Sequence, residues 1–559
     1  MKKLKLMAVA LCAVMAIAAF AGCDKKGEIN ITPETVRIAV VSKGYGSDWE
    51  KEMCKAFKAE TGIDAVVVKT GQDDGLPGLA VKQGPNQKEK DMIDIFFPTE
   101  NYVHSQLSQP GFIPGWSGTA WADLTDVYES PAVGYKESET NPNLKIKDII
   151  DPDFYKAFTY KDNKQYVMSY ATSVCGLVYN KTLWNATNAK LGSDPLVLPR
   201  TTAEMFTLFS RIVSLPNNVT TAYPYSYSGG NDYTEMITLG WWAQYDGKEV
   251  IDLALEGKYK NPTTGVITYS PEFFNTDGRL YAVKNSIGLF GSGYTDPLDQ
   301  QKPYSNAQLD FLSGNAFFNA NGDWLEREVS KQFNPGEADV EYIKLPVVSE
   351  IVLHPDVSAD FAGGMTPGNE TKLQNIIGYI DANFNLSAEI PGGQLSSAAM
   401  ALGISEGALK HIVTARKFNG YSQGTCRVVH VTPYTPRLES AKEFLRFMYS
   451  KKGQEVMMKS AFGTMCPIKV DMTQFDYFNG SPTDMSKSKI KIFQESYPIG
   501  YLSSQHQMQY LGGLSFNRFN LQRPNQWSNA AGVVSSEYGF WSNPAQWESV
   551  MNKAGVSNG

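Results

Sequence analysis

The alternation of short apolar runs with helix-type segments near the start of the chain constrains the fold most. Trp49, Met53 and Phe57 recur at helical spacing between two such runs. Three runs are rich in branched and aromatic residues, as buried strands are: VRIAVV (36–41), DAVVV (64–68) and DIFFP (94–98). Strands that alternate with helices predict parallel strand pairing and therefore an α/β fold.

Two of the expected helices begin with a capping-box sequence. Ser47 is followed three residues later by Glu50, and Thr201 by Glu204, so each serine or threonine is expected to cap its helix. Gly62 is expected to end the first of these helices. A second helix is expected at about 76–83, and a helix pair over 440–463 with its break at Lys452-Gly453.

Length and composition indicate a globular body of more than one domain. The chain has 559 residues, of which 42% are hydrophobic and 19% charged. An exported chain of this size can build a large core without disulfides. Four cysteines are therefore expected to be buried free thiols: Cys54, Cys175, Cys426 and Cys466.

The first 22 residues are typical of a secretory signal peptide. Lysines precede the apolar run Leu6 to Ala21, which as a helix would measure about 24 Å, less than the roughly 30 Å of a bilayer core. Phe20-Ala21-Gly22-Cys23 resembles the lipobox of bacterial lipoproteins, with Phe20 where leucine is usual. This resemblance implies that Cys23 carries a lipid anchor, that residues 23–35 form a tether, and that the chain works outside the cytoplasm.

The charge balance argues against two classes of partner. Removal of residues 1–22 deletes three lysines and no acid, so the formal charge of the chain changes from −7 to −10. A mildly acidic surface disfavours nucleic acid and disfavours adhesion to anionic lipid through basic patches. We therefore expect no nucleic-acid partner and assign membrane contact to the lipid on Cys23.

Signatures of catalysis and of metal binding are weak. The patterns HExxH, GxxxxGK[ST] and GxGxxG are absent, and the five histidines are too far apart in sequence to suggest a ligand pair. Carboxylates are numerous, so the sequence leaves a catalytic carboxylate pair open. We predict a protein that is not an enzyme, with no catalytic residue, no cofactor and no metal.

Five segments, taken in order, carry a family resemblance: FKAETGIDAVV (57–67), DIFFPTE (94–100), GLVYNKTLW (176–184), GNAFFNANGDWLEREV (314–329) and SAKEFLRFMYSKKGQ (440–454). Together they resemble the extracellular solute-binding proteins of sugar-type ABC importers (family 1, maltose-binding-protein-like). One stretch departs from the family pattern: roughly 355–425 stands where the family usually has a short connection.

The resemblance implies a fold of two α/β lobes with a ligand cleft between them. The chain is expected to cross between lobes near 168–172, 345–348 and 465. Lobe 1 would then comprise 36–170 and 346–465, and lobe 2 would comprise 171–345 and 466–559. The function implied is capture of a sugar or oligosaccharide by hinge closure and its delivery to the permease subunits of an ABC importer, by a monomer.

The candidate ligand contacts follow from position in this expected fold. Loops at the carboxyl ends of the strands are where open α/β sheets bind ligands. Trp324 can stack on a sugar or pack in the core, and the sequence leaves both open. The eight candidates are Lys43, Tyr45 and Asp48 after the first strand, Glu100 and Asn101 after DIFFP, Thr172 and Ser173 at the first crossing, and Trp324 in the NGDW turn.

Two other classes of function stay open. A surface-anchored glycan-acting enzyme or adhesin would share the lipid anchor, but it needs a reactive carboxylate pair or repeated modules. A peptide or metal binder of the same fold is the other alternative, and metal capture would need clustered histidine or aspartate ligands that the sequence does not show.

Overall fold

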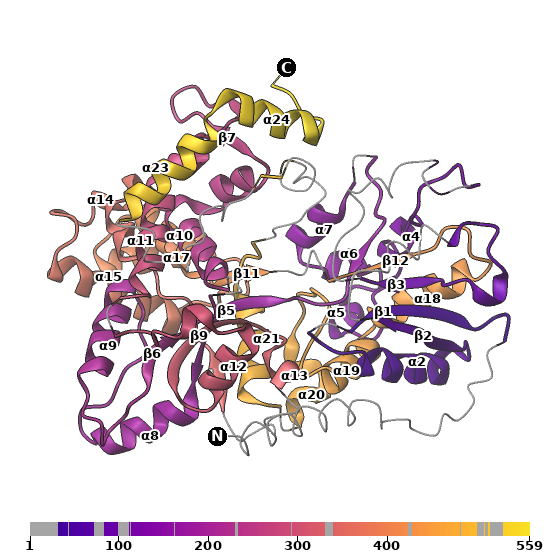
Figure 1. The fold of residues 1–559 in the computed structure, drawn as a ribbon, viewed down its shortest axis with the longest axis horizontal. Coiled ribbons are helices and arrows are strands. Elements are labelled where there is room, and N and C mark those ends of the chain that lie inside the picture. The colour runs from indigo at the N-terminus through magenta and orange to yellow at the C-terminus, as the bar shows by residue number, and fades with distance from the viewer. Residues whose placement is uncertain are drawn as a thin grey trace, which may run out of the picture.

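The protein forms two lobes, each built around its own β-sheet (Figure 1). This computed structural model describes residues 32–42, 44–71, 83–98, 111, 113, 115–160, 162–229, 233–291, 293–329, 339–422, 427–480, 482–499, 508, 513–514 and 529–558.

The first lobe contains a five-stranded sheet that is parallel on one side. β1 pairs in parallel with both β2 and β3, as the alternation of strands and helices predicts, whereas β12 is antiparallel to β3. Every residue of β1 is buried, which explains its uninterrupted apolar sequence. In sheet order the strands are β2 (Ala65–Gly71), β1 (Val36–Val41), β3 (Ile95–Phe97), β12 (Val428–Val431) and β4 (Met168–Ser169).

Helices from both halves of the chain cover this sheet. The main ones are α2 (Asp48–Thr61), α18 (Leu438–Met448) and α19 (Lys451–Ser460), and α19 packs on α2. The shorter helices are α4 (Thr125–Tyr128), α5 (Lys136–Thr140), α6 (Ile146–Ile149), α7 (Pro152–Phe158) and α20 (Asp476–Asn479), with 3-10 turns η1 (Glu89–Asp91) and η7 (Met472–Gln474).

The ends of α2 separate a correct prediction from a wrong one. Gly62 ends the helix in the left-handed conformation, and its N–H donates to the carbonyl of Lys58, as predicted. The capping box at the start is wrong, because Ser47 makes no side-chain cap and Glu50 is buried. Burial raises the pKa of Glu50 well above its ordinary value.

The break in the helix pair also differs from the prediction. α18 ends at Met448 and the hydroxyl of Ser450 caps α19, so Gly453 lies inside α19 rather than at the break. A Cβ on Gly453 would lie 2.1 Å from the carbonyl oxygen of Phe447. The glycine therefore serves close packing of the two helices.

The second lobe contains a mixed sheet. β5 is antiparallel to β9, β10 and β11, and β6 runs parallel to β9. A separate hairpin joins β7 (Lys258–Lys260) to β8 (Ile267–Tyr269). The strands of the mixed sheet are β10 (Val340–Tyr342), β5 (Val174–Asn180), β9 (Ala316–Gly322) and β6 (Tyr223–Ser226), with β11 (Gly420–Ser422) beside β5.

Longer helices surround this sheet, and the predicted cap at Thr201 is confirmed. The Thr201 side chain accepts a hydrogen bond from the Glu204 N–H at the start of α9. The helices are α8 (Lys181–Leu191), α9 (Thr202–Ser214), α10 (Thr234–Leu255), α11 (Asp277–Gly288), α12 (Tyr304–Leu312), α13 (Leu325–Val329), α21 (Asp484–Glu495), α23 (Ala530–Trp541) and α24 (Pro544–Ala554), with 3-10 turns η4 (Pro271–Asn275), η5 (Asp299–Gln301) and η6 (Ser349–Leu353).

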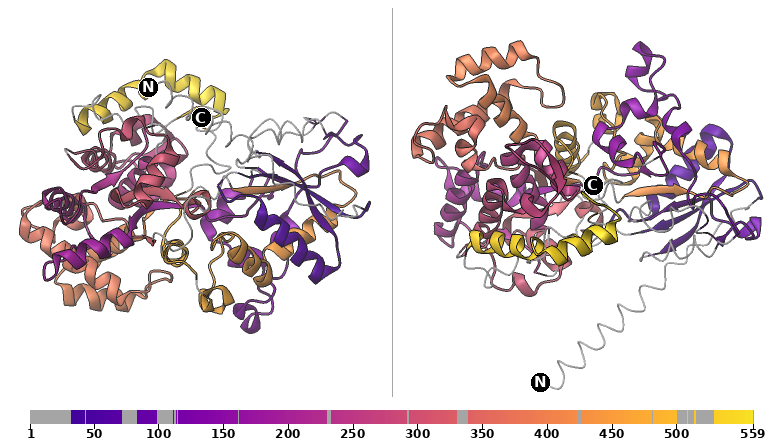
Figure 2. Two further views of the ribbon diagram at one scale, coloured as in Figure 1. Left: turned by 60° about the horizontal axis from the view of Figure 1, so that its bottom comes forward. Right: turned by 90° about the horizontal axis from the view of Figure 1, so that it is seen from above.

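Residues 355–422 belong to the second lobe, so the predicted assignment of 346–465 to lobe 1 is wrong for this part. They contain four helices that lie on the second lobe in both views of Figure 2. Gln244 in α10 donates to the carbonyl of Phe418 at 3.0 Å, and β11 then pairs with β5. The chain therefore changes sheets between β11 and β12, not near 345–348. The four helices are α14 (Pro355–Ser358), α15 (Pro367–Asn383), α16 (Gly392–Leu402) and α17 (Glu406–Arg416).

The last crossing also lies later than predicted. The first crossing is between β4 and β5, in the expected place. Beyond 465 the chain stays on the first lobe, because the N–H of Lys469 donates to the carbonyl of Ile149 at 2.7 Å. α21 then packs on β10 of the second sheet, so the change occurs between α20 and α21.

Cysteines and helix lengths bear on two further expectations. Cys54, Cys175 and Cys466 are buried free thiols, as predicted, and Cys426 lies outside the described residues. Burial raises the pKa of Cys54 and of Cys466 to about 12. Within the described part of the chain, no helix is both long enough and apolar enough to cross a membrane.

Candidate functional site

A buried contact joins the two lobes at the ends of their central strands. Tyr45, in the loop after β1, donates its hydroxyl to a carboxylate oxygen of Asp323, which directly follows β9. The same hydroxyl lies 3.0 Å from Oγ of Ser173, in the connection between β4 and β5. Tyr45 and Asp323 are almost fully buried. We call Tyr45, Ser173, Asp323 and Trp324 the interlobe seam.

Asp323 is held by groups from several segments. Thr172 Oγ1 donates to Oδ2 of Asp323 at 3.5 Å, and Lys489 donates to its backbone carbonyl at 3.3 Å. Burial raises the pKa of the Asp323 carboxyl, and the positive charge of Lys489 is the largest influence that opposes it. The pKa of Tyr45 lies well above its ordinary value, because of burial first and the nearby Asp323 charge second. Burying a carboxylate costs free energy unless hydrogen bonds compensate for the lost water, so Asp323 depends on these partners.

Ser173 adopts a backbone conformation that non-glycine residues rarely take. Its φ of 47° lies in the left-handed region. Such conformations persist where surrounding contacts hold them, and they are common at functional sites. Here the conformation occurs at the first crossing between the lobes, next to the Tyr45 hydroxyl.

Trp324 is buried in the seam and contacts both lobes. From the first lobe, Arg427, just before β12, lies over the Trp324 ring with its guanidinium carbon 5.4 Å from the ring centroid. From the second lobe, the ring of Tyr233 lies 6.0 Å from that of Trp324, measured between centroids. A Cβ on Gly44 would lie 3.3 Å from Cβ of Trp324, so the first-lobe backbone approaches it closely. In this arrangement the indole forms packing contacts across the seam.

An ion pair closes the outer edge of the same contact. Arg327 in α13 binds Asp48 at the start of α2, with 2.5 Å between Nη2 and Oδ2. The Asp48 side chain is 62% exposed, so solvent screens this pair. Pairs of this kind contribute at most about 1 kcal/mol.

A narrow pocket lies beside the seam in the second lobe, at the carboxyl ends of the parallel strands β6 and β9. Its cavity volume is about 10 Å³, about the space of one water, so its own side chains nearly fill it in this arrangement of the lobes. Aromatic rings and side-chain amides dominate its wall: Tyr225, Tyr227, Tyr233, Tyr304, Gln308, Asn319 and Asn321. Gln308 also donates to Glu328 at 2.9 Å, which connects the pocket to α13. Rings for stacking and amides for hydrogen bonding suit a polar ligand with apolar faces.

A wider hollow of about 590 Å³ lies elsewhere, where α21 meets the end of α15 and the segment 469–472. Its wall includes Lys469, Lys487 and Lys491 but none of the candidate contacts. Lys469 is already engaged with the carbonyl of Phe493 at 2.6 Å. We therefore place the candidate site at the seam and the tyrosine pocket, despite the larger size of this hollow.

Five of the eight candidate contacts lie in the interlobe seam or next to it. They are Tyr45, Asp48, Thr172, Ser173 and Trp324. The other three candidates lie outside the described residues: Lys43, Glu100 and Asn101. The lipidation candidate Cys23 also lies outside them. Sequence reasoning missed Arg427, the pocket tyrosines and the seam role of Asp323. The tyrosine-rich segment 217–233 was the one signal for the pocket.

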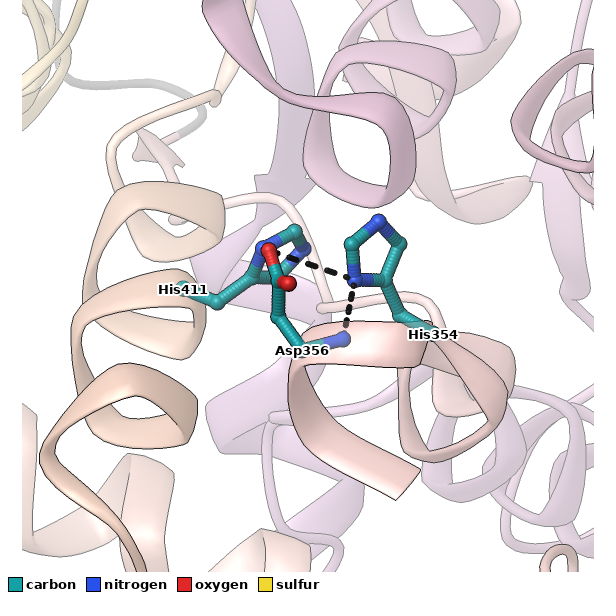
Figure 3. Close-up of side chains that lie close together, drawn as sticks. All are labelled: His354, Asp356 and His411. Carbon is teal, nitrogen blue, oxygen red and sulfur yellow. Dashed lines mark hydrogen bonds and ion pairs between the residues drawn. The ribbon is translucent and has the colours of Figure 1, made fainter. Parts of the chain in front are cut away.

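The histidines correct another expectation. His354 and His411 are far apart in sequence, but the packing of α14 on α17 brings them together with Asp356 (Figure 3). Burial lowers the pKa of His411, and burial followed by the His411 charge lowers that of His354 to about 4. The judgement that no histidines could pair was therefore wrong.

Solved structures of two solute-binding proteins resemble this chain in fold. A probable secreted solute-binding lipoprotein from Streptomyces coelicolor superposes with a TM-score of 0.50 at 11% identity, over 94% of this chain and 98% of that chain. An ABC substrate-binding protein from Listeria monocytogenes, in complex with cycloalternan, superposes with a TM-score of 0.52 at 14% identity, over 94% and 99%. No family model and no curated protein matches the chain. The predicted fold class, two α/β lobes of the solute-binding type, is confirmed.

Proposed function

We propose that this chain is an extracytoplasmic solute-binding protein that captures a sugar or oligosaccharide between its lobes and delivers it to an ABC importer. The observation that carries the proposal is the interlobe seam, where side chains from both lobes meet next to the tyrosine pocket. A ligand that contacts both lobes favours the closed state, because only that state offers both sets of contacts at once.

The chemistry of the pocket supports an oligosaccharide. Sugar rings have flat apolar faces bordered by hydroxyls, and four tyrosines with three amides offer partners for both. The similar protein from Listeria monocytogenes binds an oligosaccharide, cycloalternan. Peptides also present apolar and polar groups, so a peptide is the second candidate ligand.

We further propose that lipid on Cys23 keeps this binding protein at the membrane, close to the permease subunits. The lipobox-like sequence before Cys23 supports this step. A tether raises the effective concentration of the captured solute at the importer. The chain would act there as a monomer and without a cofactor.

A glycan-acting enzyme is less well supported. Two segments fit the GxSxG pattern, GYSQG (420–424) and GVSNG (555–559). A serine nucleophile of that type occupies a turn from a strand into a helix. Ser422 instead ends β11, with β12 as the next element described, and Ser557 follows α24. Among the elements that the structure describes, neither serine lies between a strand and a following helix.

A thermal-shift screen tests the proposed function. Protein that begins at residue 24 is heated with oligosaccharides, amino acids and peptides, and a ligand at about 100 times its Kd should stabilise it by about 2.7 kcal/mol. We expect oligosaccharides to raise the Tm and the other classes not to. Stabilisation by peptides alone, or by none of these ligands, would contradict the proposal.

One pair of variants locates the binding site. Tyr304 lines the pocket and is 43% exposed, so Tyr304→Ala should fold normally and lose most of the ligand-induced shift. Tyr379→Ala is the matched control, since Tyr379 lies in α15 and does not line the pocket. Equal shifts in the two variants would exclude the pocket as the site.

A further inference from the structure

The geometry of His354, Asp356 and His411 points to a binding site for a divalent transition metal, with Zn²⁺ as the first choice. One ligand atom from each residue lies within 4.8 Å of the other two. The three side chains come from the start of α14 and the middle of α17 and point toward one another (Figure 3). This site lies within residues 354–411, outside the interlobe seam and the tyrosine pocket.

The hydrogen bond of His411 sets its ring in the form that a metal requires. Its Nε2 lies 3.1 Å from the backbone carbonyl oxygen of Tyr245 in α10. A carbonyl oxygen only accepts, so Nε2 carries the proton and Nδ1 carries the lone pair. That Nδ1 faces Oδ2 of Asp356 at 3.6 Å. Metal-binding histidines typically use the second nitrogen in this way to fix the ring.

His354 presents its Nδ1 to the same carboxylate. Its Nδ1 lies 3.8 Å from Oδ2 of Asp356, and the two imidazole rings stack with 4.0 Å between centroids. Nδ1 of His354 also accepts the backbone N–H of Asp356 at 3.2 Å, so this nitrogen carries a lone pair as well. A bound metal would take over that lone pair from the N–H.

The spacing of the three atoms suits a tetrahedral ion. Zinc lies about 2.0–2.1 Å from nitrogen and oxygen ligands, which places neighbouring ligands about 3.4 Å apart. The distances of 3.6 and 3.8 Å to Oδ2 exceed that value by little, and all three ligand atoms lie within 4.8 Å of one another. A bound ion would draw these atoms closer and turn the two stacked rings apart, so that both Nδ1 lone pairs point at it. Two imidazoles and a carboxylate favour zinc or a neighbouring transition ion over calcium or magnesium, which prefer all-oxygen sites.

The surroundings allow an ion to enter and give the site a role. The Asp356 side chain is 67% exposed, whereas both histidine side chains are largely covered, so the carboxylate forms the open side. Water can supply the fourth ligand there. A metal at this position would fasten α14 to α17, and through His411 it would hold both against α10 of the second lobe.

Zinc binding by the full chain, purified without a histidine tag, tests the inference. Equilibrium dialysis with metal analysis should find one Zn²⁺ per chain, and Zn²⁺ should raise the Tm. Asp356→Asn removes the exposed ligand with little effect on folding, and His411→Gln removes a nitrogen ligand. We expect each variant to bind zinc at least about tenfold more weakly, since even outer partners of metal ligands affect affinity by about 10–100-fold.

Glu389→Gln is the matched control, because Glu389 is an exposed carboxylate in the same stretch but outside the cluster. It should bind zinc as the wild type does. Circular dichroism of the metal-free variants shows whether each is folded. If His411→Gln is unfolded, the zinc affinity of Asp356→Asn alone tests the inference. No zinc in the wild type, or equal affinity in the wild type and Asp356→Asn, would overturn the inference.

Discussion

Removal of the Tyr45 hydroxyl should open the protein without unfolding it. Tyr45→Phe keeps the ring in place but removes the hydrogen bond to Asp323 and the contact with Ser173. Tyr45 belongs to the first lobe and Asp323 to the second, so the loss of their hydrogen bond affects only the closed state. In the open state, water can reach both groups.

The structure sets the size of this effect. Asp323 is nearly fully buried, and a buried acceptor that loses its partner costs about 1–3 kcal/mol. At about 1.4 kcal/mol for each tenfold, the ratio of closed to open molecules should fall by about 5- to 150-fold. If the free protein is mostly open, the apparent affinity for the ligand falls by the same factor; if it is mostly closed, the free protein itself opens.

Two measurements therefore belong together. Small-angle X-ray scattering reports the radius of gyration of the ligand-free variant, and titration calorimetry reports its affinity for the ligand that the screen identifies. We expect an increase in the first, a loss in the second, or both. If neither changes while the variant is folded, the seam does not control closure.

Tyr128→Phe provides the matched control. Tyr128 is as deeply buried as Tyr45, and its hydroxyl donates to the carbonyl of Val167 at 2.8 Å within the first lobe. Its loss should lower the free energy of unfolding by about 1–3 kcal/mol and leave both the radius of gyration and the affinity unchanged. Domain opening in this variant would show that any lost buried hydroxyl has the same effect.

Three further predictions concern Trp324, Glu50 and Cys23. Trp324→Ala should lower the free energy of unfolding by about 3–5 kcal/mol, because the indole is buried; a stable variant with weakened sugar binding would instead support stacking on the ligand. Burial raises the pKa of Glu50, so the folded state holds the Glu50 proton more tightly than the unfolded state does. The contribution of Glu50 to wild-type stability should therefore fall as the pH rises above its pKa in the unfolded chain, about 4.3. Glu50→Gln should flatten that dependence in urea titrations at several pH values, and an unchanged slope would contradict the assignment. Cys23→Ser should leave the chain without lipid by mass spectrometry and detergent partitioning, because a hydroxyl cannot replace the thiol; lipid on the variant would refute the anchor.

The sequence determined the features that depend on neighbours in the chain. Branched runs predicted β1 and its parallel partners, Thr201 its own helix cap, and Gly62 the end of α2. Each of these follows from backbone geometry or from a hydrogen bond that spans a few residues. These signals indicated an α/β fold, and the resemblance of five segments to sugar-type solute-binding proteins implied the two lobes.

Tertiary packing decided the features that depend on distant segments. Glu50 fits a capping box by spacing, yet α2 turns it into the core. Residues 355–422 join the second lobe through Phe418 and β11, which no local pattern indicates. His354 and His411 meet only because α14 packs on α17. Local spacing specifies which way a side chain points along its own helix or strand, but only the assembled helices and sheets specify what it meets there.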